Sequence, residues 1–409
     1  MTRSNDKAAG KQAVSGRHEP PNRTVNYRMQ VINSLTAVPA EQWNALLAQR
    51  LGAQPQQPFL RHEFLLALEQ HRCVGRNTGW LPRHIVINDG NGALVGAMPL
   101  YVKSHSYGEY VFDWAWADAY RRNGLEYYPK LLSAIPFTPI AGCRLIALTA
   151  ELRAALLAQA LALIKEAGMS SLHMLFADDD DWQAIAAAGM LRRDGVQFHW
   201  RNQAYDHFEQ FLASLSQPKR KKIRAERRKV HEAGVSIARL SGGDITAADW
   251  AFFDRCYQST YLAHHSTPYL NEGFFRALGQ TMPEHCVLVI AQRDGQRIAS
   301  SLLLIDDQRV YGRYWGALDY VPCLHFELAY YQSIELAIER KLLVIEGGAQ
   351  GEHKLARGFE PVQTSSAHWL TEPAFLDAVD RFLQRERNAI SGYMDELHEH
   401  SPYKTEPAA

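Results

Sequence analysis

The sequence has few cysteines, and their spacing is irregular. The five are Cys73, Cys143, Cys256, Cys286 and Cys323. Because their number is odd and they are widely scattered, a disulfide framework is not expected. Neither the cysteines nor the histidines have the spacing of zinc ligands, so we expect no metal site. This pattern is typical of a protein in a reducing cytoplasm.

An excess of charge of one sign is also absent, as are long apolar runs. Lys+Arg and Asp+Glu each number 44 among 409 residues, so any affinity for nucleic acid needs a local patch. The longest apolar stretches, such as 93–102 and 154–164, are shorter than the ~20 residues that span a bilayer. Residues 1–27 are polar and lack the apolar core of a secretory signal. We therefore expect a flexible tail on a cytoplasmic protein without integral membrane association.

The sequence does contain a long internal repeat. A glycine at 189 and another at 358 are each followed, at the same spacing, by a His-Trp pair. Upstream of each lie an apolar hairpin, a helix (153–168; 324–341) and a short strand (172–176; 342–346), and a short helix then leads to each glycine. Solenoid repeats are far shorter, so this order predicts one module used twice. The expected fold class is α/β (α+β), with two mixed sheets flanked by helices.

Two modules of roughly 150 residues also agree with ordinary domain sizes. A segment rich in aromatic residues follows the first hairpin and has no counterpart in the second copy. The expected divisions are a tail (1–27), a first module (28–203) with an aromatic insertion (103–152), a basic helical connector (204–234), a second module (235–372), a C-terminal helix (373–400) and a final tail (401–409). The sequence leaves the oligomeric state open.

The first candidate site is a glycine-rich turn after the second copy's short strand. The strand ends at Glu346, and charged residues open the next helix. Glycines at a strand end let backbone N–H groups approach a ligand closely, and a helix start favours anions. The glycines and charged residues of this turn are Gly347, Gly348, Gln350, Gly351, Glu352, His353, Lys354 and Arg357. The alternative interpretation is a tight turn with a helix cap and solvated charges.

The aromatic insertion is the second candidate. Its rings can form the wall of an acceptor-binding cleft, with a few convergent polar groups among them. The candidate residues are Asp113, Trp114, Trp116, Asp118, Tyr127, Tyr128 and Lys130. The alternative is a small satellite core in which the insertion buries its own rings. Its length favours a functional role.

Two further segments carry candidate residues. The connector contains a basic run that can bind phosphate groups with low sequence specificity. The candidate phosphate contacts are Lys219, Arg220, Lys222, Arg224 and Arg227. The alternative is a solvated helix that pairs with acidic neighbours. On the strand 309–317, Tyr311, Arg313 and Trp315 alternate on one face, where they either line a cleft or are half-buried strand residues.

Four segments resemble one protein family over nearly the whole chain after the tail. They are 111–120, 127–132, 136–139 and 346–359. They are similar to the bacterial FemAB-like group of GNAT-family N-acetyltransferases, also labelled peptidoglycan-biosynthesis proteins. The resemblance implies two tandem GNAT (acyl-CoA N-acyltransferase) modules and a basic connector like that of Fem-type transferases.

The resemblance also implies a chemistry. In a GNAT module the end of the short strand borders the place where an acyl thioester meets an amine. Glu346, Glu352 and His353 are then candidate bases, and Lys354 and Arg357 are candidates for holding an anion or the oxyanion. The strand containing Tyr311, Arg313 and Trp315 corresponds to the one along which GNAT enzymes hold the pantetheine arm.

We therefore expect an enzyme that transfers an acyl or aminoacyl group to an amine, which can be a cell-wall precursor. No tightly bound cofactor is expected. The usual GNAT pyrophosphate loop is missing from both copies, so acyl-CoA and aminoacyl-tRNA both remain open as donors. Two other hypotheses stay open: a nucleic-acid-binding protein that uses the basic helix, with tRNA as a partner, and an inactive GNAT-like ligand-binding protein.

Overall fold

The chain folds into two lobes, described by a computed structural model over residues 26–348 and 351–404. The first lobe holds most of the first half of the chain. Its strands are β1 (Arg28–Ile32), β2 (Trp80–Pro82), β3 (His84–Asn88), β4 (Leu94–Met98), β5 (Tyr101–Lys103), β6 (Lys130–Ser133), β7 (Ile146–Ala147), β8 (Ser171–Leu175) and β9 (Leu191–Arg201). Its helices are η1 (Leu35–Ala37), α1 (Ala40–Leu51), η2 (Pro58–Leu60), α2 (His62–Gln70), α3 (Trp114–Arg122), α4 (Ala150–Ala167), η3 (Asp179–Asp181) and α5 (Trp182–Ala187).

The second lobe follows a helical connector, α6 (Phe208–Ser214) and α7 (Gln217–Glu232). Its strands are β10 (Val235–Ser241), β11 (Cys286–Arg293), β12 (Gln296–Ile305), β13 (Arg309–Ala317), β14 (Val344–Glu346) and β15 (Glu360–Leu370). Its helices are η4 (Gly242–Asp244), α8 (Ala247–Ala263), α9 (Glu272–Thr281), η5 (Pro283–His285), α10 (Leu324–Phe326), the π-helical turn η6 (Glu327–Tyr331), α11 (Gln332–Glu339) and η7 (Glu352–Arg357). A long helix, α12 (Pro373–Glu399), follows β15.

The predicted helices begin and end at residues that cap helix termini. Thr149 accepts a hydrogen bond from the backbone of Leu152 at the start of α4, and Gly168 ends this helix with a φ of 61°. At the start of α8, Thr246 and Asp249 form a reciprocal capping box. The predicted helix over 324–341 is present as α10, η6 and α11 in succession, with a π-helical turn in its middle.

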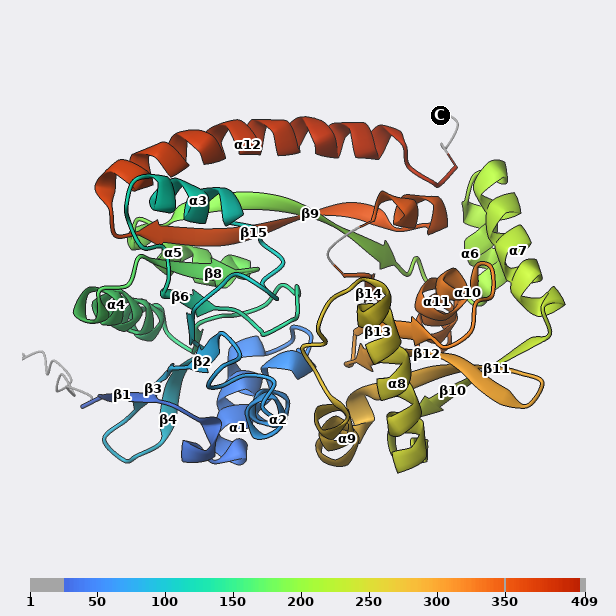
Figure 1. Cartoon of the computed structure of the whole chain (residues 1–409), viewed down its shortest axis with the longest axis horizontal. Helices are drawn as coiled ribbons and strands as arrows, with labels where there is room; N and C mark the ends of the chain where they lie inside the picture. The colour runs from blue at the N-terminus through green and yellow to red at the C-terminus, as the bar shows by residue number, and fades with distance from the viewer. Residues whose placement is uncertain (1–25, 349–350, 405–409) are drawn as a thin grey trace, which may run out of the picture.

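The two lobes share one continuous sheet because they exchange their closing strands. β9 pairs with β14 of the second lobe, whereas β15 pairs with β8 of the first. β9 and β15 also pair with each other, antiparallel, around the opposed residues Gly195 and Thr364. The result is an eleven-stranded sheet, β10-β11-β12-β13-β14-β9-β15-β8-β6-β5-β2, beside a four-stranded sheet, β1-β3-β4-β7. Figure 1 shows β9 and β15 running from one lobe to the other.

This exchange accounts for the repeated His-Trp pairs. His199 on β9 lies opposite Glu346, and His368 on β15 lies opposite His173. Each pair therefore lies against the short strand of the opposite lobe. Trp200 is fully buried in the second lobe's core, and Trp369 packs against that of the first.

The segment 103–152 contains a strand of the sheet. β6 lies between β5 and β8, antiparallel to one and parallel to the other, as β13 lies between β12 and β14. The residues that the first lobe has in addition to those of the second lobe therefore form two segments, one before β6 and one after it. The first of these segments holds α3.

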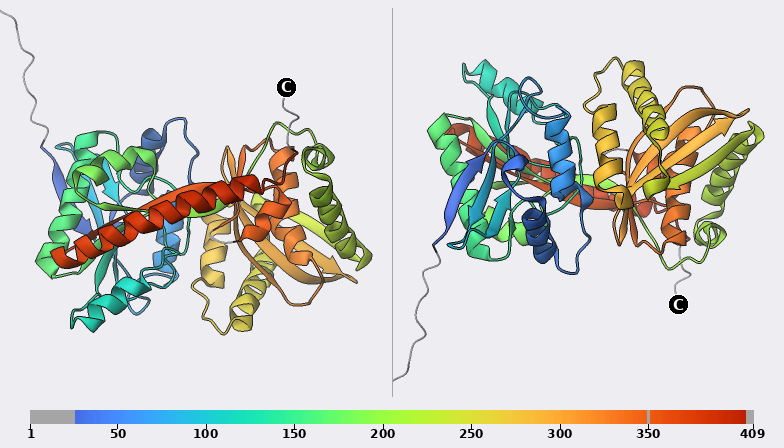
Figure 2. Two further views of the ribbon diagram at one scale, coloured as in Figure 1. Left: turned by 90° about the horizontal axis from the view of Figure 1, so that it is seen from above. Right: turned by 90° about the horizontal axis from the view of Figure 1, so that it is seen from below.

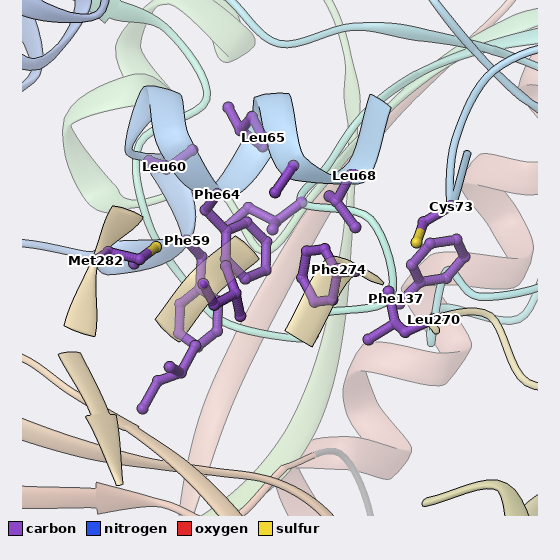
Figure 3. Close-up of a cluster of buried hydrophobic side chains, with 14 of the residues drawn as sticks. Phe59, Leu60, Phe64, Leu65, Leu68, Cys73, Phe137, Leu270, Phe274 and Met282 are labelled. Carbon is purple, nitrogen blue, oxygen red and sulfur yellow. The ribbon is translucent and has the colours of Figure 1, made fainter. Parts of the chain in front are cut away.

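An apolar seam joins the lobes away from the exchanged strands. In Figure 3, side chains from η2 and α2 meet side chains from α9 and the loop before it. Phe64 contacts Phe274 edge to face with ring centroids 5.5 Å apart, and Phe59 contacts Tyr311 in the same way at 5.0 Å. Because aromatic contacts of this kind are buried and specific, the seam fixes how the lobes face each other.

Helix α12 crosses both lobes over the exchanged strands, as Figure 2 shows from above. Val379 and Leu383 pack into a cluster with Trp116 and Tyr120 of α3. Glu386 accepts two hydrogen bonds of 2.8 Å from Arg193 on β9. Within the described residues, every helix is too short or too polar to cross a membrane.

The exchange predicts that the halves of the chain depend on each other for folding. Fragments 1–203 and 204–409, expressed separately, should aggregate, because β8 and β14 would each present an unpaired edge. Expressed together, they should form a soluble one-to-one complex, measurable by size-exclusion chromatography with light scattering. A soluble, cooperatively unfolding fragment 1–203 on its own would contradict this view.

Candidate functional site

The glycine-rich turn begins where β14 ends, beside β13. The two strands pair in parallel only from Arg309–Val344 to Tyr311–Glu346, after which β13 continues without β14 and pairs with β12 alone. The chain then runs through Gly347 and Gly348 into the segment before η7. Gly348 and Gly351 have φ values of 80° and 118°, which other residues rarely adopt. Gln350, a predicted ligand contact, lies outside the described residues.

A pocket of about 400 Å³ opens where β13 and β14 separate, and both lobes line it. The lining residues are Ser106, Tyr107, Gly108, Tyr110, Phe112, Trp114 and Pro139 from the first lobe and Tyr269, Gly312, Arg313, Tyr330, Gly347, Gly348 and Lys354 from the second. The structure thus brings the predicted aromatic segment and the glycine-rich turn to one cavity. Of the predicted site residues, Trp114, Arg313, Gly347, Gly348 and Lys354 line it.

Lys354 is the predicted catalytic residue that reaches this pocket. Its side chain is 3% exposed, and the ammonium donates a 3.2 Å hydrogen bond to the carbonyl oxygen of Gly348. Burial lowers the pKa of Lys354 to about 8. Near neutral pH this side chain is therefore present in both protonation states, as a group that takes up and releases a proton must be.

Glu346 lies beneath the pocket instead of lining it. Its carboxylate is 1% exposed and forms an ion pair with Arg309 of β13. Burial raises the pKa of Glu346, and the positive charge of Arg309 opposes that rise. One carboxylate oxygen, Oε2, is buried without a hydrogen-bond partner.

His353 contacts the pocket only through a neighbour. Its Nε2 lies 2.9 Å from the hydroxyl oxygen of Tyr330, and the Tyr330 side chain lines the pocket. Burial lowers the pKa of His353, and the positive charges of Arg357, Lys354 and Lys222 lower it further. Burial raises the pKa of Tyr330 to about 12, so this hydroxyl stays protonated.

The remaining charged residues of the turn have partners elsewhere. Glu352 is exposed and accepts a 2.6 Å hydrogen bond from Tyr393 of α12. Arg357 is buried, donates 2.8 Å to Glu226 of α7 and lies over the ring of Phe326. These contacts join η7 to α12 and to the connector.

Most of the other residues predicted in the aromatic insertion are buried behind the pocket wall. Asp113 accepts hydrogen bonds from Lys130 and, at 2.6 Å, from Tyr127, and all three are buried. Trp116 is buried in the cluster beneath α12. Asp118 forms ion pairs with exposed arginines of its own helix. The Tyr128 hydroxyl lies 2.8 Å from that of Ser106, so it contacts the pocket lining from outside.

The three predicted residues of β13 have different surroundings. Tyr311 is buried and donates a 2.8 Å hydrogen bond to Asp306. Arg313 lines the pocket and donates 2.6 Å to the carbonyl oxygen of Phe137 in the first lobe. Trp315 lines a second pocket, of about 450 Å³, at the start of α10.

The basic connector is partly neutralised by the protein itself. Arg224 forms an ion pair with Glu209, and Arg227 binds both Glu327 and Glu335. Arg220 donates to carbonyl oxygens at the end of α6. Lys222 is exposed and Lys219 half-buried, and neither has an ion pair of 4 Å or less with a described residue. Of the predicted phosphate contacts, it is therefore mainly these two lysines that stay available to bind a phosphate.

The equivalent opening in the first lobe is filled. There the chain after β6 returns between β6 and β8, and Gly142 hydrogen-bonds to the backbone of Phe176. Arg144, fully buried, donates to the carbonyl oxygens of Leu175 and Ile140 at 2.8 and 2.7 Å. Asp181 accepts hydrogen bonds from two backbone N–H groups of this segment. Within the part of the chain that the structure describes, it is therefore the second lobe that keeps the opening.

Sequence reasoning missed several residues that line the pocket. They are Ser106, Tyr107, Gly108, Tyr110, Phe112, Pro139, Tyr269, Gly312 and Tyr330. The high aromatic content of 107–114 was a usable signal for the first group. Tyr269 and Tyr330 lie on separate elements far along the chain, and no local pattern distinguishes them.

Comparisons with known proteins agree with this architecture. The profile of the FemAB_like family, described as peptidoglycan biosynthesis/recognition, matches residues 34–405. The solved structure of FemX has a TM-score of 0.52 at 11% identity and covers 86% of this chain and 100% of its own. The C-terminal domain (DUF2156) of an Agrobacterium fabrum protein has a TM-score of 0.52 at 9% identity, covering 84% and 97%. No curated protein matches the sequence.

A tandem GNAT protein from the clavulanic acid biosynthesis pathway is also similar, with a TM-score of 0.47 at 13% identity, covering 85% of this chain and 99% of its own. At these identities the solved structures inform only the fold. The predicted fold class, two GNAT-like modules in tandem, is confirmed.

The position of Glu346 generates a prediction about stability. Glu346→Gln should lower the free energy of unfolding by roughly 1–2 kcal/mol, because Arg309 loses its ionic partner but remains partly solvated. Urea denaturation measures the change. Combining it with Arg309→Met should cost less than the sum of the two single changes. Full stability together with a hundredfold loss of turnover would instead identify Glu346 as the catalytic base.

Proposed function

The chain belongs to the FemAB_like family, and on this premise we propose that its shared pocket transfers an acyl or aminoacyl group from an activated donor to an amine. The family description favours an acceptor related to cell-wall precursors. The tandem GNAT fold supports acyl transfer in general. The single observation that carries the proposal is Lys354, whose pKa lies near neutrality beside an opening between two parallel strands.

Lys354 is proposed as the base. An amine attacks a carbonyl carbon only after losing a proton, and a base with a pKa near the working pH is most effective in removing it. Neutral Lys354 accepts that proton, and the new bond forms between the amine nitrogen and the acyl carbon. The bond from that carbon to the donor sulfur or oxygen then breaks.

Tyr330 is proposed to supply the proton that the leaving group takes up. Its side chain lines the same pocket, and its hydroxyl remains protonated at neutral pH. It gives its proton to the departing sulfur or oxygen. The amine nitrogen releases its second proton as it becomes the amide nitrogen, and this proton returns to Tyr330 through His353, 2.9 Å away, while Lys354 releases the first proton to solvent before the next cycle. No metal ion enters this scheme, because the carbonyl is activated by its own leaving group.

The donor is proposed to be either an acyl-CoA or an aminoacyl-tRNA. On β13, Arg313 lines the shared pocket and Trp315 lines the second pocket, so the donor is proposed to extend along this strand. In the turn between β13 and α10, Asp319 forms an ion pair with Arg293. This pair is neutral overall, so the turn offers no net positive charge to a pyrophosphate, and donors other than CoA therefore stay in the proposal.

The assigned base predicts the pH dependence of the reaction. Turnover should rise as the pH passes through about 8 and level off above it, because only neutral Lys354 accepts a proton. Lys354→Arg keeps the positive charge but cannot act as a base, so it should lower turnover by ~10²-fold or more and lose this rise. Mass spectrometry of products, with acyl-CoA and aminoacyl-tRNA tested against a panel of amines, gives the rates.

The acceptor amine also titrates, but equally in both enzymes, so the difference between the two profiles isolates Lys354. Lys229→Arg, on the exposed face of α7, is the matched control and should leave the profile unchanged. An unaltered pH profile and rate in Lys354→Arg would exclude Lys354 as the base.

A further inference from the structure

Two buried lysines face each other directly behind the aromatic wall of the pocket. Lys103 on β5 and Lys130 on β6 are opposed in the antiparallel register, and both are 0% exposed. Like charges directly opposite in a sheet repel, and burial increases the cost. Neither lysine lines the pocket, and the proposed reaction does not use them.

Two carboxylates from one short segment neutralise these lysines. The Lys130 ammonium donates 2.8 Å to Glu109 and also hydrogen-bonds to Asp113, and Lys103 lies 3.7 Å from Glu109. The Lys130 ammonium further donates 2.8 Å to the hydroxyl of Ser106. All of these side chains are buried. We call residues 106–114, which supply the two carboxylates, the strap.

The strap alternates between anchoring residues and pocket residues. Ser106, Glu109 and Asp113 point inward to the lysines, whereas the residues between and after them line the pocket: Tyr107, Gly108, Tyr110, Phe112 and Trp114. Tyr107, Phe112 and Trp114 are 57%, 53% and 41% exposed. Their own packing is therefore limited, and their positions depend on the anchors.

The charge states support this arrangement. Burial lowers the pKa of Lys103 to about 7, so the two opposed lysines carry less than two full charges near neutrality. Burial opposes the charge of Lys130 as well, but Glu109 and Asp113 raise the pKa of Lys130 above its ordinary value. Lys130 is thus the fixed cation of the cluster. Lys103 also donates 3.2 Å to the carbonyl oxygen of Tyr107, which ties it to the strap backbone.

We infer that Lys103 and Lys130 are positioning residues for ligand recognition, because they hold the strap and with it the aromatic wall of the shared pocket. Removing Lys130 leaves two buried carboxylates without their main partner. These carboxylates regain solvation only if the strap leaves the sheet, and the aromatic wall then moves with it. The kinetic part of the test rests on the proposed function, whereas the backbone part does not.

Hydrogen–deuterium exchange with mass spectrometry tests the backbone part. In Lys130→Met, peptides covering the strap should exchange at least about tenfold faster, while β11 and β12 stay protected. Lys130→Met combined with Asp113→Asn should recover part of the protection, because fewer charges are left unpaired. The double variant also keeps the test usable should the single one fold poorly.

The matched control is Arg50→Met. Arg50 is another buried first-lobe cation, held by Asp178 and Asp181 away from the pocket lining. Its loss should destabilise the protein to a similar degree without changing exchange in the strap. Unchanged strap exchange in Lys130→Met, or equal acceleration in Arg50→Met, would overturn the inference.

Kinetics test the consequence for recognition. In Lys130→Met the acceptor KM should rise by about tenfold, because the aromatic rings of the wall are no longer held in place, while kcat changes little. In the double variant, whose strap is partly protected again, the rise in KM should be smaller. Arg50→Met should leave KM unchanged. A fall in kcat alone would overturn the positioning role, and an absence of transfer in the wild type would contradict the proposed function but not the exchange result.

Discussion

The antiparallel pairing of β9 with β15 is the contact on which the rest of the structure depends. Because each of these strands also pairs with the short strand of the opposite lobe, one sheet runs through the whole molecule. β14, which separates from β13 at the opening, is held in the sheet by β9, which comes from the first lobe. The pocket is thus a property of the assembled pair of modules, and the first lobe supplies its aromatic wall while the second supplies its ionisable groups.

The internal repeat was enough to predict two modules of the same fold, because the order of elements and the His-Trp pairs recur at constant spacing. It could not predict the strand exchange. A closing strand has the same pattern of side chains whether it pairs within its own module or with the other, so hydrophobic periodicity does not distinguish the two arrangements. The segment 103–152 was expected to be one insertion for a related reason: β6 is only four residues long and lies between two irregular loops.

A local sequence pattern was enough to predict the glycine-rich turn of the candidate site. It was not enough to predict which of the side chains are buried. Glycines following a strand identified the turn that contains Lys354. The sequence could not show which of its neighbouring charged residues face the cavity, because that depends on partners far along the chain, such as Arg309 for Glu346 and Glu226 for Arg357. Asp113 and Lys130 were recognised as polar residues near aromatic rings, but the sequence could not show that both are buried and lie outside the pocket lining.

Gly195 and Thr364 lie opposite each other at the middle of two strands that occupy equivalent places in the two repeats. Identical subunits that meet about a twofold axis pair the same segment with itself in this way. The chain therefore has the form of an ancestral homodimer whose two copies became one polypeptide. Such a fusion frees the halves from having to remain alike. Here the equivalent cleft of the first lobe is filled, with Arg144 at its centre, and this lobe instead shapes the cleft of the second.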